Sequence, residues 1–298
     1  MKNMRKRLLY LLAATALVLT MIAPGPIAQA SQIGNRGASV FNDALADFGV
    51  ELFRRAFAET FAETGGENTL VSPLSVILAL TMTANGADGN TRSEMQDVLG
   101  QGLALESLTH LLRDYAKGLP STEDSSLNIA NSIWYDDDRV EVLEAFLATN
   151  REFFDAEILA ADFGDPATVG LINAWVKEKT EEMIDKIIAE IPEEALMYLI
   201  NAIAFDAEWL RKFDDNGVRE RNFTAYDGKV QRTEFMSSME SFLIEMDDAV
   251  GFLKHYKGGH YSFAAILPDE GIDIADFIEG LTGESLIGAL ESAKSNRP

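Results

Sequence analysis

The sequence predicts an α+β fold in which helices dominate the first part of the chain and hairpins follow in the second. Three observations support this. Helical spacing of apolar residues dominates the first 190 positions, whereas short strands joined by turns dominate from residue 219 onward. Strands and helices do not alternate regularly, as they would in a parallel α/β sheet. Residues 197–205 are rich in β-formers and apolar on both registers, which is typical of a strand covered on both faces.

The first thirty residues have the pattern of a secretory signal peptide. Four basic residues lie between positions 2 and 7, residues 8–23 are uncharged and mostly apolar, and Ala28-Gln29-Ala30 offers small residues for cleavage. We expect cleavage after Ala30, a secreted protein, and a folded region over residues 31–298. An uncleaved membrane anchor is the alternative for this segment. No later stretch is long and apolar enough to span a bilayer, so no membrane association is expected after cleavage.

The composition excludes several classes of function. The formal net charge is −23, and loss of the four basic residues of the leader would bring it to −27. Such an acidic chain lacks the basic surface that nucleic-acid binding requires. The absence of cysteine excludes disulfides, thiolate metal sites and a cysteine nucleophile.

Four helices are predicted before residue 120. Residues 41–61 have apolar residues at helical spacing and lead to Gly65-Gly66. Ser72 is a capping residue directly before Pro73, which predicts a helix over residues 74–84. Residues 91–94, TRSE, have the pattern of a capping box and are expected to open a helix that ends at Gly100. A short helix is expected over residues 103–115.

The middle of the chain contains the strand that we expect to lie at the centre of the sheet. Strands are predicted over residues 127–135 and 157–161, and helices over residues 144–154 and 167–188. In the second helix one side is expected to carry Leu171, Trp175, Met183 and Ile187. The strand 197–209 follows, with Asn201 in its middle. Because a buried amide needs partners, this strand should make a specific polar contact at its centre.

The last eighty residues are predicted to form hairpins and a final helix. Residues 222–226 and 229–235 flank Asp227-Gly228, a strong signal for a two-residue hairpin loop. Further strands are expected over residues 241–246, 250–256 and 261–267, and a helix over residues 273–290.

No common catalytic or metal-binding motif is present. The chain has no G-x-S-x-G elbow, no H-E-x-x-H and no phosphate-binding glycine loop. Of the three histidines, His110 lies in a predicted helix, and His255 and His260 flank the Gly-Gly turn at 258–259. The pair at the turn is expected to decorate the surface, with adventitious metal binding as the alternative. The acidic run 136–138 lacks the glycine and distal glutamate of a calcium loop, so a solvated turn is expected there. We therefore expect no enzyme, no catalytic residue, no cofactor and no metal.

Motifs along the whole mature chain resemble those of the serpins. Residues 68–75, NTLVSPLS, are similar to the N-terminal signature of that family, and residues 172–176, INAWV, look like its helix that crosses the main sheet. Residues 199–203, LINAI, with Phe205 and Trp209, resemble the third strand of that sheet. The LPDEG turn at 267–271 matches a later family landmark in the right order.

The resemblance implies a fold, a mechanism and a set of site residues. The serpin fold has N-terminal helices on a large mixed sheet and a smaller β-barrel-like region. Serpins inhibit serine, and in some members cysteine, proteases: the protease cleaves a reactive loop, which then inserts into the sheet as a new strand. Ser72, Ser75 and Asn201 match the shutter residues beneath the point where the sheet opens, and Trp209 matches the breach tryptophan, where the loop first inserts. An ordinary helix cap and a plain core aromatic are the alternatives for Ser72 and Trp209.

Two departures from the family pattern qualify the resemblance. Asp206 stands where many members have a lysine, which puts one surface contact in doubt. No residues before Pro298 match the fifth and sixth strands of the main sheet, the reactive loop or the last strands of the second sheet. We therefore expect an incomplete, monomeric serpin domain whose strand 197–209 is left as an apolar edge, and which does not itself inhibit proteases. The alternatives are a non-inhibitory serpin scaffold that binds or stores a ligand, and the product of a non-functional gene fragment.

Overall fold

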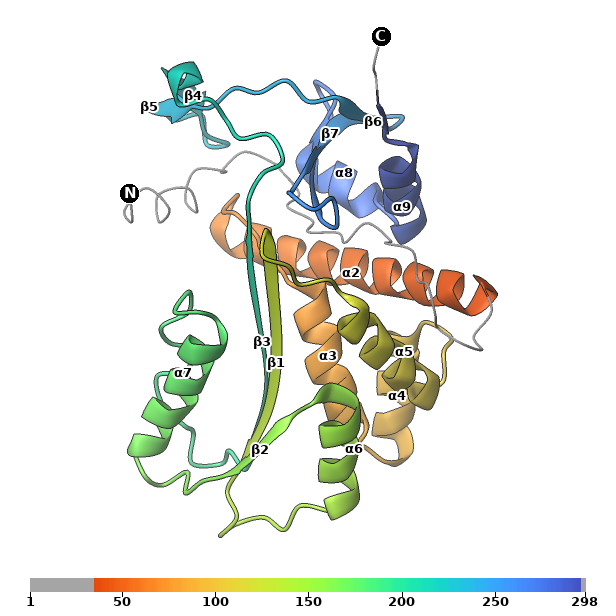
Figure 1. Cartoon of the computed structure of the whole chain (residues 1–298), viewed down its shortest axis with the longest axis vertical. Coiled ribbons are helices and arrows are strands. Elements are labelled where there is room, and N and C mark those ends of the chain that lie inside the picture. The colour runs from red at the N-terminus through yellow and green to blue at the C-terminus, as the bar shows by residue number, and fades with distance from the viewer. Residues whose placement is uncertain (1–34, 296–298) are drawn as a thin grey trace. The chain divides into compact units, whose positions relative to one another are not determined.

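The computed structural model describes residues 35–295, and the predicted signal peptide lies outside these residues. The fold is α+β, as predicted (Figure 1). The helices are α2 (Asn35–Thr64), α3 (Pro73–Ala84), α4 (Gly89–Gly100), α5 (Leu105–Gly118), α6 (Glu144–Phe154), α7 (Ala167–Lys179), α8 (Ile274–Gly280) and α9 (Gly283–Ser292). The strands are β1 (Ser125–Tyr135), β2 (Glu157–Ala160), β3 (Met197–Ala207), β4 (Arg219–Thr224), β5 (Val230–Phe235), β6 (Phe242–Glu245), β7 (Ala249–His255), β8 (Ser262–Pro268) and β9 (Lys294–Ser295). Residues 35–48 and 72–207 form one compact unit, which we call the β3 unit, and residues 49–71 and 208–295 form a second, the β7 unit.

The β3 unit is built on the three-stranded sheet β2-β1-β3. Strand β1 pairs parallel with β2 and antiparallel with β3, in an unbroken register from Ser125↔Ala207 to Tyr135↔Met197. Helices α7 and α3 lie on opposite sides of these two long strands (Figure 1). Among the described residues β3 pairs only with β1, so it is an edge strand here and β1 is the central one. The expectation that residues 197–209 lie at the centre of the sheet is therefore wrong for the described residues, whereas the apolar edge that the family resemblance implies is observed.

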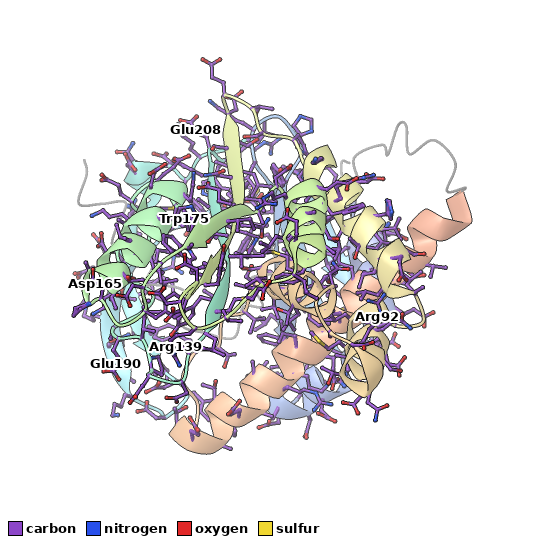
Figure 2. The ribbon with its side chains drawn as sticks, turned by 90° about the horizontal axis from the view of Figure 1, so that it is seen from below. Arg92, Arg139, Asp165, Trp175, Glu190 and Glu208 are labelled. Carbon is purple, nitrogen blue, oxygen red and sulfur yellow. The ribbon has the colours of Figure 1, made fainter. Side chains whose placement is uncertain are left out.

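Alternation along β3 explains why both of its registers are apolar. Ile200 and Ala202 pack with Trp134 of β1 in one core, which α7 completes with Ile172, Trp175 and Val176. Trp175 is labelled in Figure 2 and is 8% exposed. Since successive side chains of a strand point to opposite faces, Asn201 points to the other face, toward α3. The prediction that both faces are covered is confirmed.

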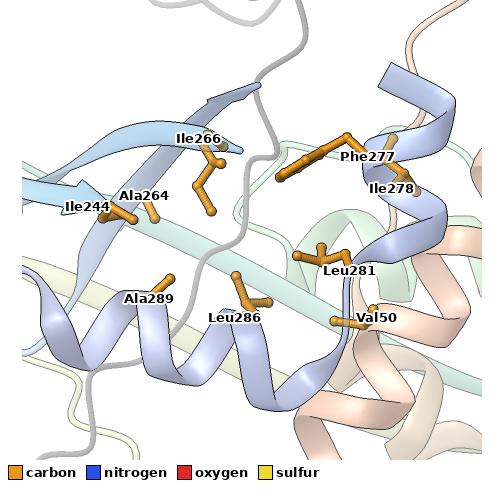
Figure 3. Close-up of a cluster of buried hydrophobic side chains, with 10 residues drawn as sticks. Val50, Ile244, Ala264, Ile266, Phe277, Ile278, Leu281, Leu286 and Ala289 are labelled. Atoms are coloured by element: carbon orange, nitrogen blue, oxygen red, sulfur yellow. The ribbon is translucent and has the colours of Figure 1, made fainter. Parts of the chain in front are cut away.

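The β7 unit contains the four-stranded sheet β8-β7-β6-β9 and the separate hairpin β4-β5. Helices α8 and α9 bury Phe277, Ile278, Leu281 and Leu286 against Ile244 of β6, Ile266 of β8 and Val50 of α2 (Figure 3). The region that was expected to resemble a barrel is an open sheet in the described residues.

Two helix starts differ from the predictions. Helix α4 begins at Gly89, with Asp88 at its N-cap position, so the predicted capping box at residues 91–94 is wrong. The predicted helix 273–290 is two helices, because the chain breaks at Leu281 and starts again at Thr282. There Thr282 and Ser285 exchange side-chain and backbone hydrogen bonds in a capping box.

Helix α7 ends at Lys179, nine residues before the predicted end. Glu181 and Glu182 follow with φ of 50° and 64°, which is left-handed backbone and incompatible with a continued helix. The chain then folds back along α7, where Asn173 Oδ1 accepts hydrogen bonds from the amides of Ile187 and Ile188 at 2.8 and 3.2 Å. The predicted apolar side is therefore wrong beyond Lys179: Met183 is 53% exposed.

The β4-β5 hairpin lies where it was predicted, but its loop is longer. Strands β4 and β5 flank residues 225–229, and Gly228 N–H donates to the carbonyl of Ala225 at 2.9 Å. Gly228 has φ of 78°, so Asp227-Gly228 ends a turn of this loop and does not form a two-residue connection.

Candidate functional site

The candidate site is a chain of side-chain hydrogen bonds across the centre of β3. Ser75 Oγ donates to Asn201 Oδ1 at 2.5 Å. Asn201 Nδ2 donates to Asn131 Oδ1 at 2.8 Å, and Asn131 Nδ2 donates to the carbonyl of Phe154 at 2.8 Å. This relay joins α3, β3, β1 and the last residue of α6. We call Ser75, Asn201 and Asn131 the amide relay.

Local structure places each member of the amide relay. Pro73 sets the start of α3, which puts Ser75 in the first turn of that helix. Asn201 and Asn131 are direct partners in the antiparallel register of β3 and β1, so their side chains lie on the same face. Asn131 is 6% exposed, and both ends of its amide are hydrogen-bonded. The prediction that Asn201 makes a specific polar contact at the centre of the strand is confirmed.

Ser72 stands apart from the amide relay. It occupies the N-cap position of α3 with extended backbone angles, but its side chain makes no capping hydrogen bond. The residue is exposed. The sequence located this helix start correctly, while the expected cap contact is absent from the structure.

A groove lies beside the amide relay on the same unit. It has a volume of about 380 Å³ and is lined mostly by apolar side chains. The lining comes from one face of α3, the returning segment after α7 and the first half of β3: Ser75, Val76, Ala79, Leu80, Ile187, Tyr198, Leu199, Ile200 and Asn201. Ser75 and Asn201 of the relay are thus part of the groove wall.

Trp209 lies in the β7 unit, within an aromatic cluster. Its ring stacks on Tyr256 with centroids 4.2 Å apart and planes 12° apart, and its edge contacts involve Phe213 and Phe263. Two backbone hydrogen bonds hold the segment on either side of it: Leu210 N–H donates to the carbonyl of His255, and Lys257 N–H donates to the carbonyl of Glu208. Burial raises the pKa of Tyr256 to about 12.

Charges near Trp209 are arranged around two glutamates. Hydrogen bonds from Lys257 and Lys212 hold the pKa of the exposed Glu208 below its ordinary value. The second glutamate, Glu240, pairs with Lys254, whose side chain is 3% exposed. Sequence reasoning did not single out Lys254, although its place in β7 is a buried register position.

Other residues considered from the sequence have structural roles. His255 Nδ1 and Ser262 Oγ are 2.6 Å apart across β7 and β8, and His110 contacts the ring of Phe153. Within residues 35–295 no group of three or more histidine, aspartate or glutamate side chains is placed to hold a metal ion. The expectation of a solvated acidic turn is wrong for Asp136, which is 1% exposed, while Asp137 and Asp138 are exposed. The nearest cation to Asp136 is Arg139, labelled in Figure 2, at 3.8 Å.

Comparison with known proteins decides the family. The family model described as Serpin (serine protease inhibitor) matches residues 43–298. The chain belongs to the serpin family. This family consists of protease inhibitors and related binding proteins and not of enzymes, in agreement with the prediction.

Individual relatives agree with this assignment. Corticosteroid-binding globulin of Homo sapiens is 30% identical over 76% of this chain and 58% of its own length. Iripin-5 of Ixodes ricinus is 32% identical over 74% of this chain and 58% of its own length. The crystal structure of a thermophilic serpin, tengpin, in the native state superposes with a TM-score of 0.81 and 42% identity, covering 95% of this chain and 70% of that one. The same protein in the latent state gives a TM-score of 0.80 and 45% identity, over 86% of this chain and 68% of that one.

The chain thus spans 58% of the length of the curated relatives named above. Among the residues that the structure describes, no helix combines the length and apolar character needed to cross a membrane.

Proposed function

We propose that this chain is the sheet-bearing part of a secreted, monomeric inhibitor of serine endopeptidases that acts by loop insertion. The signal peptide predicted over residues 1–30 supports secretion, and family membership supports the inhibitory mechanism. In that mechanism the protease serine adds to the scissile carbonyl of the reactive loop, the amine leaves with a proton, and an ester joins the loop to the protease. Insertion of the cleaved loop into the sheet then traps this ester before water hydrolyses it.

The observation that carries the proposal is the edge of β3 with the amide relay behind it. One edge of β3 pairs with β1 over eleven residues, and no strand pairs with the other edge within the described chain. An added strand can form main-chain hydrogen bonds along such an edge. The relay holds the middle of β3 to α3 and β1 by directional hydrogen bonds between side chains, which do not occupy the main-chain groups of this edge.

A structural relative supports the conformational part of the proposal. Tengpin has been captured in two states, described as native and latent, and it is 42–45% identical to this chain in the matched region. A relative that adopts two states supports a function in which the fold of this chain also changes conformation.

The test is an SDS-stable complex with a protease. Because the chain spans 70% of native tengpin, we would join residues 31–298 to the part of tengpin that it does not cover, with an arginine before the scissile bond, and mix the product with trypsin. We expect a covalent band with the combined mass of trypsin and the cleaved chimera. Residues 31–298 alone serve as the negative control. Cleaved loop with fully active trypsin, and no covalent band, would refute the inhibitory proposal.

A second candidate function is ligand binding by a non-inhibitory scaffold. Corticosteroid-binding globulin is a 30% identical relative, and the groove beside β3 is mostly apolar. Equilibrium dialysis with a radiolabelled steroid separates the two functions. Saturable binding that Ala79→Trp in the groove abolishes favours the scaffold, whereas the absence of bound steroid up to millimolar concentration contradicts it.

A further inference from the structure

Lys254 is a charged residue at a core position of β7. It is 2% exposed, and the strand places it among buried positions of the sheet. Lysine is almost never fully buried without a partner, because taking its charge out of water is unfavourable. A methionine or leucine would fill the same register position without this desolvation. The charge at this position therefore needs an explanation beyond packing.

Two kinds of group compensate the ammonium of Lys254. Glu240 Oε1 lies 2.5 Å from Lys254 Nζ, and Ser238 Oγ donates to the same carboxylate oxygen at 2.6 Å. The Nζ also lies over two aromatic rings, 4.3 Å from the centroid of Phe213 and 5.4 Å from that of Trp209. A cation is attracted to the face of an aromatic ring, and most strongly to tryptophan in a desolvated site.

These contacts bear directly on the position of Trp209. The indole stacks on Tyr256, meets Phe213 and Phe263 edge-on, and has the Lys254 ammonium within cation–π distance of its ring. Trp209 itself is only half-buried, so packing alone encloses it incompletely. It also follows the end of β3 by two residues, where the chain leaves the strand.

We propose that Lys254, held by Glu240, is a positioning residue that fixes the Trp209 indole against Tyr256 and so fixes the segment that follows β3. Resting on the proposed function, the same pair sets how readily the sheet opens for the inserting loop at that end of β3. Without the cation, Trp209 samples other rotamers, and the segment Glu208–Leu210 keeps its backbone hydrogen bonds to His255 and Lys257. The segment that responds to this device is the reactive loop of the proposed inhibitor.

The first experiment separates positioning from stability, and it uses the 298-residue chain. The variants are Lys254→Met, Glu240→Gln, Lys254→Met/Glu240→Leu and Lys254→Arg, with Lys229→Met as the matched control because Lys229 is an exposed, ion-paired lysine of the same unit. Acrylamide quenching reports on Trp209 after subtraction of the signal of the same variant carrying Trp209→Phe. Urea unfolding of each variant reports on stability.

We expect the resistance to urea and the protection of Trp209 from acrylamide to change independently among these variants. Glu240→Gln should be the least stable variant, because it leaves a buried ammonium without a counter-charge. The double variant should unfold at a urea concentration close to that of the wild type, yet its Trp209 should be quenched at least twofold more strongly. Lys254→Arg should restore protection, since a guanidinium also stacks on aromatic faces. If Trp209 in the double variant is as well protected from acrylamide as in the wild type, Lys254 and Glu240 only fill space in the core, and the inference is wrong.

The second experiment places the same variants in the trypsin chimera. We expect the double variant to raise the fraction of chimera that is cleaved without forming a covalent complex at least twofold, and Lys229→Met to leave it unchanged. An unchanged fraction in the double variant would overturn the link to sheet opening. If the wild-type chimera forms no complex at all, the proposed function fails, while the quenching result still decides whether Lys254 positions Trp209.

Discussion

Replacement of Asn201 by alanine tests the amide relay most directly. Asn201 accepts one hydrogen bond from Ser75 and donates one to Asn131, and each contributes about 1 kcal/mol to the free energy of unfolding. The substitution also leaves Asn131 Oδ1 without its donor at a position that is 6% exposed, and an unsatisfied buried acceptor costs about 1–3 kcal/mol. Ser75 is only partly buried and can turn its hydroxyl to water. We therefore expect Asn201→Ala to lower the free energy of unfolding by about 3 kcal/mol.

The assay is urea unfolding followed by tryptophan fluorescence in a Trp209→Phe background. The remaining tryptophans, Trp134 and Trp175, are both buried in the β3 unit, so the signal reports on that unit. Asn222→Ala, on the exposed face of β4, is the control and should change the unfolding free energy by less than about 0.5 kcal/mol. The double variant Asn131→Ala/Asn201→Ala should lose less than the sum of the two single variants, because neither amide is then left without its partner. A loss below about 1 kcal/mol for Asn201→Ala, or strict additivity in the double variant, would refute the relay as described.

Two further predictions concern the β7 unit. Gly251→Ala should unfold the unit or prevent its accumulation, because a Cβ at residue 251 would clash with the carbonyl oxygen of Ala265 on the neighbouring strand. Gly288→Ala in α9 is the matched control: its Cβ meets open space, and the substitution should stabilise the protein by about 1 kcal/mol. Trp209 fluorescence during urea unfolding measures both variants, and wild-type stability of Gly251→Ala would contradict the register of β7 and β8. Burial raises the pKa of Tyr256 to about 12, above that of a tyrosine in the unfolded chain. The stability that the neutral, buried phenol of Tyr256 contributes is therefore complete below pH 10 and is lost as the pH rises toward 12. Absorbance at 295 nm should show a late tyrosine ionisation near pH 12 that Tyr256→Phe removes, and identical titrations of the two proteins would contradict this.

The sequence correctly predicted those helices and strands whose ends are set by residues close by in the chain. The sequence Ser72-Pro73 marks the start of α3, and helix α6 spans the predicted residues 144–154. The apolar pattern on both registers of 197–205 correctly indicated a strand covered on both faces. In these cases the residues that fix the structure lie within one turn or one strand of the feature they determine.

The failures have a different physical origin. Helix α7 ends early because Asn173, six residues before its end, binds the backbone of Ile187 and Ile188, a contact that helical periodicity does not reveal. The break before α9 did carry a local signal, since Thr282 and Ser285 have capping spacing, but the apolar run through it masked the signal. The burial of Lys254 was not predicted, because a charged residue in an alternating strand is normally assigned to the solvent side.

Asn131 shows what the sequence alone leaves undetermined about the site. It lies in a strand of mixed faces, and nothing in that strand singles it out. Only the antiparallel register, which pairs Asn131 with Asn201, makes the two amides partners. A correct register would have predicted the relay at once, because two amides on one face of neighbouring strands can satisfy each other.

This dependence also explains why a polar group lies at the centre of an otherwise apolar strand. If β3 slipped by one residue relative to β1, Asn201 would face the apolar core under α7, and Asn131 would lose its partner. Ile200 would then face Ser75, which gains nothing from an aliphatic neighbour. Because the buried amides make only one register favourable, β3 keeps its alignment even though one of its edges is unpaired in the described chain. A strand whose own register is fixed in this way offers a defined set of backbone donors and acceptors to any strand that pairs with its open edge.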